Sequence, residues 1–175
     1  MNLDPFNEYS DAEIWEVLTK TKLDKMMEQL SSAAGAPISE SKKNMNRQTI
    51  LKTMIAENGS NLSVGTRQLI CLARAMLRQP KLLIFDEATS ALDLETDRFM
   101  QKILKEQFKG CTVLVIAHRL ETVITCDNII VMGGGKVIEE GKPIDLLNKK
   151  GEDGRGPFKR LVEATGKTYE ELLAM

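Results

Sequence analysis

The sequence predicts an α/β fold, and three observations lead to that prediction. Two apolar runs, Leu82–Phe85 and Thr112–Ala117, have the length and composition of buried strands. An amphipathic stretch from residue 93 to about 108 separates them, which predicts a βαβ unit whose parallel sheet is covered on both faces. Ahead of the first strand, Val64–Arg78 carries apolar residues spaced by three and four and stops before a proline, as a helix does.

The N-terminal third is predicted to be helical. Ser10 and Glu13 have the spacing of a capping box, and apolar residues continue at helical spacing as far as Leu30. From Ser31 to Arg47 the sequence becomes small, polar and basic, which predicts a solvated surface loop.

The C-terminal part begins with a short predicted helix at Leu120–Ile124. Strands at 128–132 and 136–140 flank three glycines, a pattern that indicates a hairpin, and Gly141–Pro143 marks its exit. A flexible connection at 151–157 then leads to helical segments at 158–164 and 169–173.

Composition excludes several classes of function. The chain has 175 residues, enough for one domain, with a net charge of -1 and 5% aromatic residues. This balance gives no basis for nucleic-acid binding. No apolar run approaches the roughly 18 residues of a membrane span, and the N-terminus lacks the features of a signal peptide. We expect any membrane part to lie on another segment or chain.

Chemically capable residues gather where strands or loops meet helices, which is where α/β sheets place their ligands. Ser63 and Gly65 precede the long helix, and a hydroxyl and a glycine at a helix start can make an anion site. The alternative is a plain N-cap, because serine is a favoured capping residue. At the end of the first strand, Asp86 is suited to hold Mg²⁺ and Glu87 to orient or deprotonate a water. Their alternative is a pair of solvated loop acids.

Two further residues belong to this group. Asp93 is a natural N-cap of the following helix, and that role can be its whole role within one monomer. His118 follows the second strand, next to the strand that ends at Glu87, so its imidazole could reach the same crevice.

The order and spacing of these segments resemble the nucleotide-binding domain of ABC transporters. Asn61–Leu69 resembles the signature motif, Lys81–Glu87 the Walker B strand, Ala88–Asp93 the D-loop and His118 the switch histidine. The sequences of Asn2–Phe6 and of Ser63–Arg78 most resemble the multidrug-resistance-associated C-type subfamily, in particular its second nucleotide-binding domain.

The resemblance implies a fold and a set of roles. The fold is a partial P-loop NTPase (ABC ATPase) fold: a mostly parallel sheet flanked by helices, with part of the helical subdomain at the N-terminus. Two such domains sandwich two ATP molecules, so Ser63 and Gly65 would grip the γ-phosphate of ATP held mainly by the partner domain. In the chain's own site Asp86 would serve Mg²⁺, Glu87 the hydrolytic water and His118 the γ-phosphate. Asp93 would signal across the interface.

The same resemblance implies an organisation and a location. Residues 1–57 would form a partial helical subdomain with the polar loop at 31–47, residues 58–150 the C-terminal part of the ATPase core, and residues 151–175 a helical tail. The expected partners are a second nucleotide-binding domain and the transmembrane domains of an ABC transporter, at the cytoplasmic face of a membrane.

Two departures from the family pattern stand out. The signature usually has glutamine after its glycine, where this chain has Thr66. No Gly-x-x-x-x-Gly-Lys-Ser/Thr occurs in the chain, so the phosphate cradle of the Walker A loop is missing. We therefore expect this chain not to hydrolyse ATP alone, and we expect its incomplete sheet to expose apolar surface and an unpaired edge.

Three functions are compatible with these features. The leading hypothesis is a fragment of a transport ATPase that couples ATP binding and hydrolysis to transmembrane transport. The second is a non-catalytic interaction module that completes a partner's ATP site in trans. The third is a soluble ABC-type ATPase of DNA repair or translation, whose expected basic face or coiled-coil insert has no counterpart here.

Overall fold

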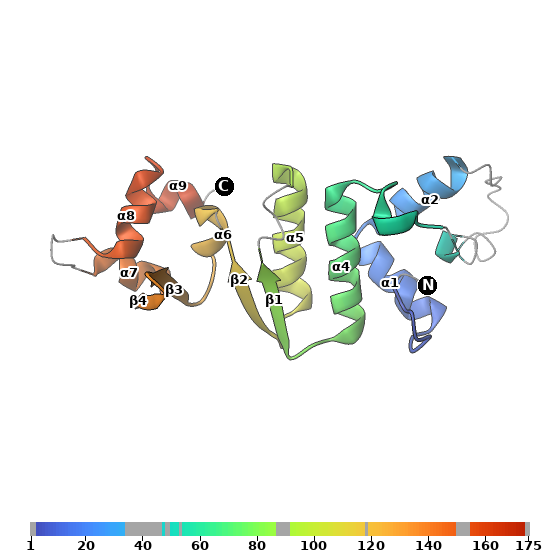
Figure 1. Ribbon diagram of the computed structural model, residues 1–175, viewed down its shortest axis with the longest axis horizontal. Coiled ribbons are helices and arrows are strands. Elements are labelled where there is room, and N and C mark those ends of the chain that lie inside the picture. The colour runs from blue at the N-terminus through green and yellow to red at the C-terminus, as the bar shows by residue number, and fades with distance from the viewer. Residues whose placement is uncertain are drawn as a thin grey trace. The chain divides into compact units, whose positions relative to one another are not determined.

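The computed structural model of the chain describes residues 3–33, 47, 50–52, 54–86, 92–117, 119–149 and 155–173. The chain divides into two compact units, Met1–Leu114 and Val115–Met175, and each is described by itself (Figure 1). The predicted boundaries at residues 57 and 150 refer to the subdomains of the family. The division into compact units does not test them, so they stay a prediction.

The first unit contains helices α1 (Asp11–Lys20), α2 (Leu23–Ala33), α4 (Val64–Arg78) and α5 (Leu94–Gln107), with a 3₁₀ turn, η2, at Glu57–Gly59. The capping box at α1 is confirmed: the Ser10 hydroxyl accepts from the Glu13 N–H, and the Glu13 carboxylate accepts from the Ser10 N–H at 2.8 Å. The predicted loop begins later than expected, because α2 extends to Ala33. Apart from Arg47, the remainder of that loop lies outside the described residues.

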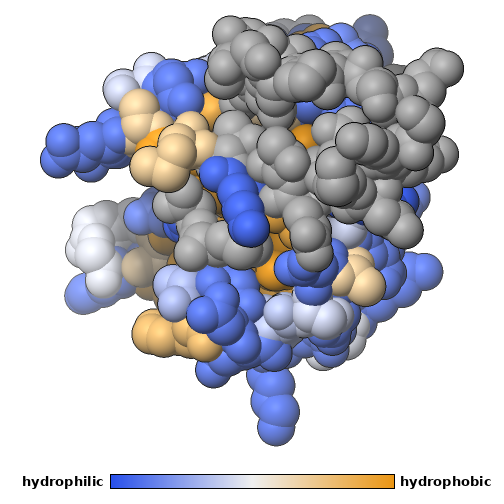
Figure 2. Space-filling view, turned by 90° about the vertical axis from the view of Figure 1, so that its right-hand side faces the viewer, coloured by the Kyte–Doolittle hydropathy of each residue, from blue (hydrophilic) through white to orange (hydrophobic). Residues whose placement is uncertain are grey.

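One hydrophobic core holds the first unit together. Its fully buried side chains come from α1, α2, α4 and α5, the four helices that present apolar stripes at helical spacing. The best-buried members are Ile14, Leu18, Leu23, Leu72, Ala73 and Met100. Over the face that carries α1 and α2, the described side chains are mainly hydrophilic, with smaller hydrophobic areas between them (Figure 2).

The predicted central helix and strands are confirmed. Helix α4 has the predicted bounds, because the Ser63 side chain caps its start and Gln79, in the left-handed conformation with φ 44°, ends it before Pro80. Strands β1 (Leu82–Asp86) and β2 (Thr112–Ile116) form a two-stranded sheet and run in the same direction in Figure 1.

The prediction that this sheet is covered on both faces is wrong. Leu83, Phe85 and Val113 pack against the core of the first unit. The alternate side chains are about half exposed, and these are Leu82, Ile84, Leu114 and Ile116. Side chains alternate between the two faces of a strand, so a continuous apolar run buries both faces only where both are packed. The exposed apolar surface expected of an incomplete sheet is therefore present.

The second unit contains α6 (Leu120–Val123), β3 (Ile129–Gly133), β4 (Lys136–Gly141), α7 (Pro143–Asn148), α8 (Pro157–Ala164) and α9 (Tyr169–Leu173). Strands β3 and β4 form the predicted antiparallel hairpin, with a register irregularity between Val131 and Met132. Helix α7 is not among the predicted elements, because the sequence pattern at Pro143 indicates only the exit of the hairpin. Proline is in fact favoured in the first turn of a helix, where its missing N–H costs nothing.

The core of the second unit is small and lies between the hairpin and the C-terminal helices. It consists of Ile124, Ile129, Leu146, Phe158, Val162 and Leu172. Glu139 of β4 is also buried, and its carboxylate accepts a hydrogen bond from the Phe158 N–H at 2.7 Å, in the first turn of α8. A charged side chain is rarely buried without a partner, so this contact fixes α8 against the hairpin.

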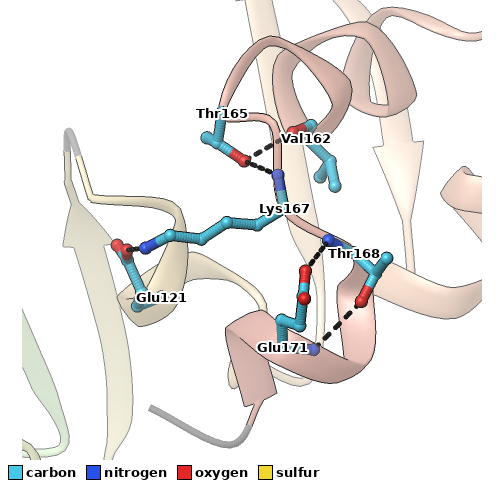
Figure 3. A network of polar contacts seen from close by, with 6 residues as sticks. All are labelled: Glu121, Val162, Thr165, Lys167, Thr168 and Glu171. Carbon is cyan, nitrogen blue, oxygen red and sulfur yellow. Dashed lines mark hydrogen bonds and ion pairs between the residues drawn. The ribbon is translucent and has the colours of Figure 1, made fainter.

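Polar contacts secure the start of α9 (Figure 3). The Thr168 N–H donates to the Glu171 carboxylate at 2.7 Å, and the Glu171 N–H donates to the Thr168 hydroxyl at 3.2 Å. The neighbouring Lys167 ammonium forms an ion pair with Glu121 of α6 at 3.3 Å. Within the described part of the chain, no helix combines the length and apolarity needed to cross a bilayer.

Candidate functional site

The start of α4 is a helix N-terminus whose cap is neutral. Ser63 has extended backbone angles, φ -63° and ψ 161°, and its hydroxyl accepts from the Thr66 N–H at 3.1 Å. The first turn of α4 contains no acidic residue. It contains instead Arg67, whose guanidinium donates to the Asn58 carbonyl at 3.4 Å. The positive end of the helix dipole is therefore not neutralised by a local carboxylate.

The start of α5 has the same geometry and the opposite electrostatics. Asp93 caps it: one carboxylate oxygen accepts from the Thr96 N–H at 2.9 Å and the other from the Thr96 hydroxyl at 2.7 Å. Hydrogen bonds from the Thr96 N–H and then from its hydroxyl lower the pKa of Asp93, which keeps the cap ionised. Glu95 and Asp97 add further acidic side chains in the first turn.

Gly65 marks where these two helix starts lie side by side. A Cβ atom on Gly65 would lie 3.3 Å from Thr96 Cγ2 and 3.5 Å from Leu92 Cδ2. Both helices begin at the end of the unit where β1 finishes, as Figure 1 shows. The structure therefore brings together three residues that the sequence singled out separately: Ser63, Gly65 and Asp93.

The contrast between the two caps decides which helix start can take an anion. A helix N-terminus attracts anions through free N–H groups and its positive dipole. At α5 the Asp93 carboxylate already supplies the negative charge, and an added phosphate would be repelled by it. At α4 the cap is an uncharged hydroxyl with a cation in the same turn. The α4 start is therefore the better anion site of the pair.

Asp86 is the last residue of β1, and its side chain is exposed at the carboxyl end of the strand. Among the described residues, no three acidic, cysteine or histidine side chains gather as a metal site. A single exposed carboxylate still suits Mg²⁺, which usually takes one or two carboxylates and completes its shell with phosphate and water. The other two predicted site residues, Glu87 and His118, lie outside the described residues.

A hollow of about 540 Å³ in the first unit lies away from these residues. Its lining includes Lys20, Pro80 and Cys111, so it opens near the amino ends of β1 and β2. Ligands of α/β sheets bind at the carboxyl ends of strands. The hollow is therefore not the nucleotide site that the sequence predicts.

The sequence did not predict that a residue of α2 takes part at the start of α4. Thr66 is buried, and its hydroxyl lies 3.0 Å from Met26 Sδ and 2.9 Å from the Ser63 hydroxyl. In the sequence, Thr66 stands out only as a departure from the family pattern. Met26 gave no local signal, because a methionine at helical spacing is typical of a core position.

Comparisons with known proteins identify the family of the chain. A family model described as "ABC transporter" matches residues 6–90. The rat protein "ATP-binding cassette sub-family C member 2" is 44% identical over 151 residues, which cover 86% of this chain and 9% of the relative. The human "ATP-binding cassette sub-family C member 4" is 42% identical over 166 residues, covering 95% of the chain and 11% of the relative.

A Drosophila melanogaster relative, "Probable multidrug resistance-associated protein lethal(2)03659", is 38% identical over 178 residues, covering 97% of the chain and 12% of the relative. The chain thus spans roughly a tenth of the length of these curated relatives. It belongs to the ABC transporter family, as nucleotide-binding domain sequence of the C-type subfamily. Family membership implies a P-loop NTPase fold.

Proposed function

We propose that this chain supplies the signature surface of an ATP sandwich in a C-type ABC transporter. In this arrangement the start of α4 grips the phosphates of a nucleotide held mainly by a partner nucleotide-binding domain. The observation that carries the proposal is the pair of adjacent helix starts, of which only α4 has a neutral cap and a free positive pole.

Ser63, Gly65 and Asp93 have different roles at the start of α4. The Ser63 hydroxyl and the N–H groups behind it face an incoming phosphate, and Gly65 keeps that approach free of a side chain. Gly65 has a second role in the monomer, because a Cβ there would press on Thr96 and Leu92. Asp93 stays ionised beside this grip, where it repels a misplaced phosphate and can signal across the sandwich.

The chain's own half-site would use Asp86, Glu87 and His118. Asp86 has the exposed carboxylate that would hold Mg²⁺, which supplies charge neutralisation to the ATP phosphates when bound. Glu87 would orient the hydrolytic water, and His118 would contact the γ-phosphate. The full domain would have the mostly parallel sheet of its family and serve as a second nucleotide-binding domain.

In the assembled transporter we place this chain at the cytoplasmic face of a membrane, together with transmembrane domains and a second nucleotide-binding domain. ATP binding and hydrolysis there would drive transport. The 175-residue chain contains no Gly-x-x-x-x-Gly-Lys-Ser/Thr. A phosphate cradle contributes several charge-assisted hydrogen bonds of about 1.5–3 kcal/mol each, so we expect no turnover by this chain alone. Turnover by the purified chain that Glu87→Gln abolishes would contradict this.

The test is nucleotide-dependent association. The full chain is mixed with a nucleotide-binding domain that carries an intact P-loop, and association is measured by sedimentation with and without AMP-PNP and Mg²⁺. We expect AMP-PNP to strengthen association and Ser63→Arg to abolish that gain, because a long side chain fills the phosphate position. Thr19→Val is the matched control, since Thr19 lies in α1 and its hydroxyl donates to the Trp15 carbonyl of the same helix. Association that ignores both AMP-PNP and Ser63→Arg would refute the proposal.

A further inference from the structure

A directed chain of hydroxyl groups runs from the start of α4 to α2. The Ser63 hydroxyl lies 2.9 Å from the Thr66 hydroxyl, which lies 3.0 Å from Met26 Sδ. A thioether sulfur can only accept a hydrogen bond. The Thr66 proton must therefore point at Met26, and the bond between the two hydroxyls requires the Ser63 proton to point at Thr66. The Ser63 oxygen accepts from the Thr66 N–H in the same arrangement.

The neighbouring helix start shows that this direction is not a general property of the motif. At α5 a threonine again stands three residues after the cap, but Thr96 donates to Asp93, since an ionised carboxylate has no proton to give. At α4 the cap is the donor. The single proton with which Ser63 could bind a phosphate oxygen is thus already used within the helix start.

We propose that Thr66 is a positioning residue that holds the Ser63 proton away from the nucleotide and links phosphate binding at α4 to helix α2. This rests on the proposed function of Ser63. A phosphate that accepts from Ser63 must break the hydrogen bond between the two hydroxyls. The free energy gained from the new bond to phosphate is therefore reduced by the free energy of the bond that is lost. Thr66 is buried, whereas Ser63 is exposed, so a phosphate can reach the Ser63 hydroxyl from solvent.

The chain of bonds also predicts a signal in α2. When Ser63 turns to the phosphate, Thr66 loses its donor and its bond to Met26 becomes free to rearrange. Met26 packs at the edge of the core that α2 shares with α4. Phosphate binding at the start of α4 therefore changes the surroundings of Met26, which is 40 positions from Thr66 in the sequence.

The test repeats the association experiment with the full chain, the P-loop partner, AMP-PNP and Mg²⁺. Thr66→Val removes the hydroxyl and keeps the shape, so Ser63 is free and we expect association about two- to tenfold tighter, the range that one neutral hydrogen bond converts to. Thr66→Ser keeps the hydroxyl and should restore wild-type affinity. Met26→Leu removes the acceptor, which lets Thr66 donate to Ser63 instead, and should tighten association in the same direction.

A spectroscopic reading separates positioning from mere support of the fold. With methyl-labelled methionine, the Met26 resonance, assigned through Met26→Leu, should shift when AMP-PNP and partner are added to wild type and should not shift in Thr66→Val. Unchanged affinity in both Thr66→Val and Met26→Leu overturns the inference, as does equal tightening in Thr66→Val and Thr66→Ser. If association of the wild-type chain does not depend on AMP-PNP, or if Ser63→Arg leaves that dependence unchanged, the proposed function is refuted. That outcome differs from a failure of the inference about Thr66, in which wild type depends on AMP-PNP but the Thr66 and Met26 variants have no effect.

Discussion

Replacing Glu139 by alanine tests how the second unit holds its C-terminal helices. The Glu139 side chain is 3% exposed and accepts from the Phe158 N–H at 2.7 Å. Gly156 lies so close that a Cβ on it would be 2.5 Å from the carboxylate oxygen, so the acid fits against the backbone before α8. Glu139→Ala removes the acceptor and leaves a buried N–H without a partner.

The expected loss follows from that single contact. Removing the acceptor of a hydrogen bond to a charged group costs about 1.5–3 kcal/mol, because the buried donor keeps its desolvation penalty and loses its partner. We expect the free energy for opening α8 to fall by about 1.5–3 kcal/mol, which is roughly a ten- to hundredfold rise in the open population. Glu139→Gln keeps an acceptor oxygen without the charge, so its loss should be about half as large.

Amide hydrogen exchange at Phe158 measures this directly, because that N–H is the donor. Glu140→Ala is the matched control: Glu140 is the next residue, its side chain is exposed, and it accepts an exposed hydrogen bond from Asn128. We expect the control to change exchange by less than about 0.5 kcal/mol. Equal exchange at Phe158 in Glu139→Ala and Glu140→Ala would refute the reasoning.

Two further predictions concern the first unit. Burial by itself raises the pKa of Asp4, but hydrogen bonds from the backbone N–H groups of residues 6–9 outweigh it and lower the pKa below its ordinary 3.8. The stability that Asp4 contributes is therefore complete above pH 3.8 and is lost as the pH falls through the lower pKa of Asp4 in the folded protein. The free energy of unfolding, measured as a function of pH, should show this loss in wild type. An equally steep loss in Asp4→Asn would count against it. Gly65→Ala should change the unfolding free energy by less than about 1 kcal/mol, since the helix gain from alanine offsets the contact of its Cβ with Thr96. The same variant should weaken AMP-PNP-dependent association, and undiminished association would show that phosphate does not approach there.

Most elements of the fold could be predicted because their signals are local. Helix α4 begins at a serine that caps it and ends before a proline, and both signals lie within one turn of the helix ends. The capping box at Ser10 and the glycine turn of the β3–β4 hairpin are equally local. Helix α7 was missed because Pro143 permits two structures, a turn or a first helical turn, and only the following contacts choose between them.

Ser63, Gly65, Asp86 and Asp93 could be selected as site candidates because they stand where strands end and helices begin, and because the order and spacing of their segments resemble one family. Their family was readable from order and spacing alone. Their roles in nucleotide binding stay predictions, as do those of Glu87 and His118. That the starts of α4 and α5 are neighbours depended on packing between segments about 30 residues apart, which no local pattern encodes.

The sequence by itself determined the strands, the family and every described helix except α7, because caps, periodicity and motif spacing act over a few residues. Only the tertiary structure decided that Glu139 is buried, that Thr66 reaches Met26, and which face of β1 and β2 packs against the core. In each case the outcome depends on which segment, distant in the sequence, packs against the residue. Burial and hydrogen-bond partners follow from that packing, and the local sequence around a strand glutamate or a helical threonine does not predict it.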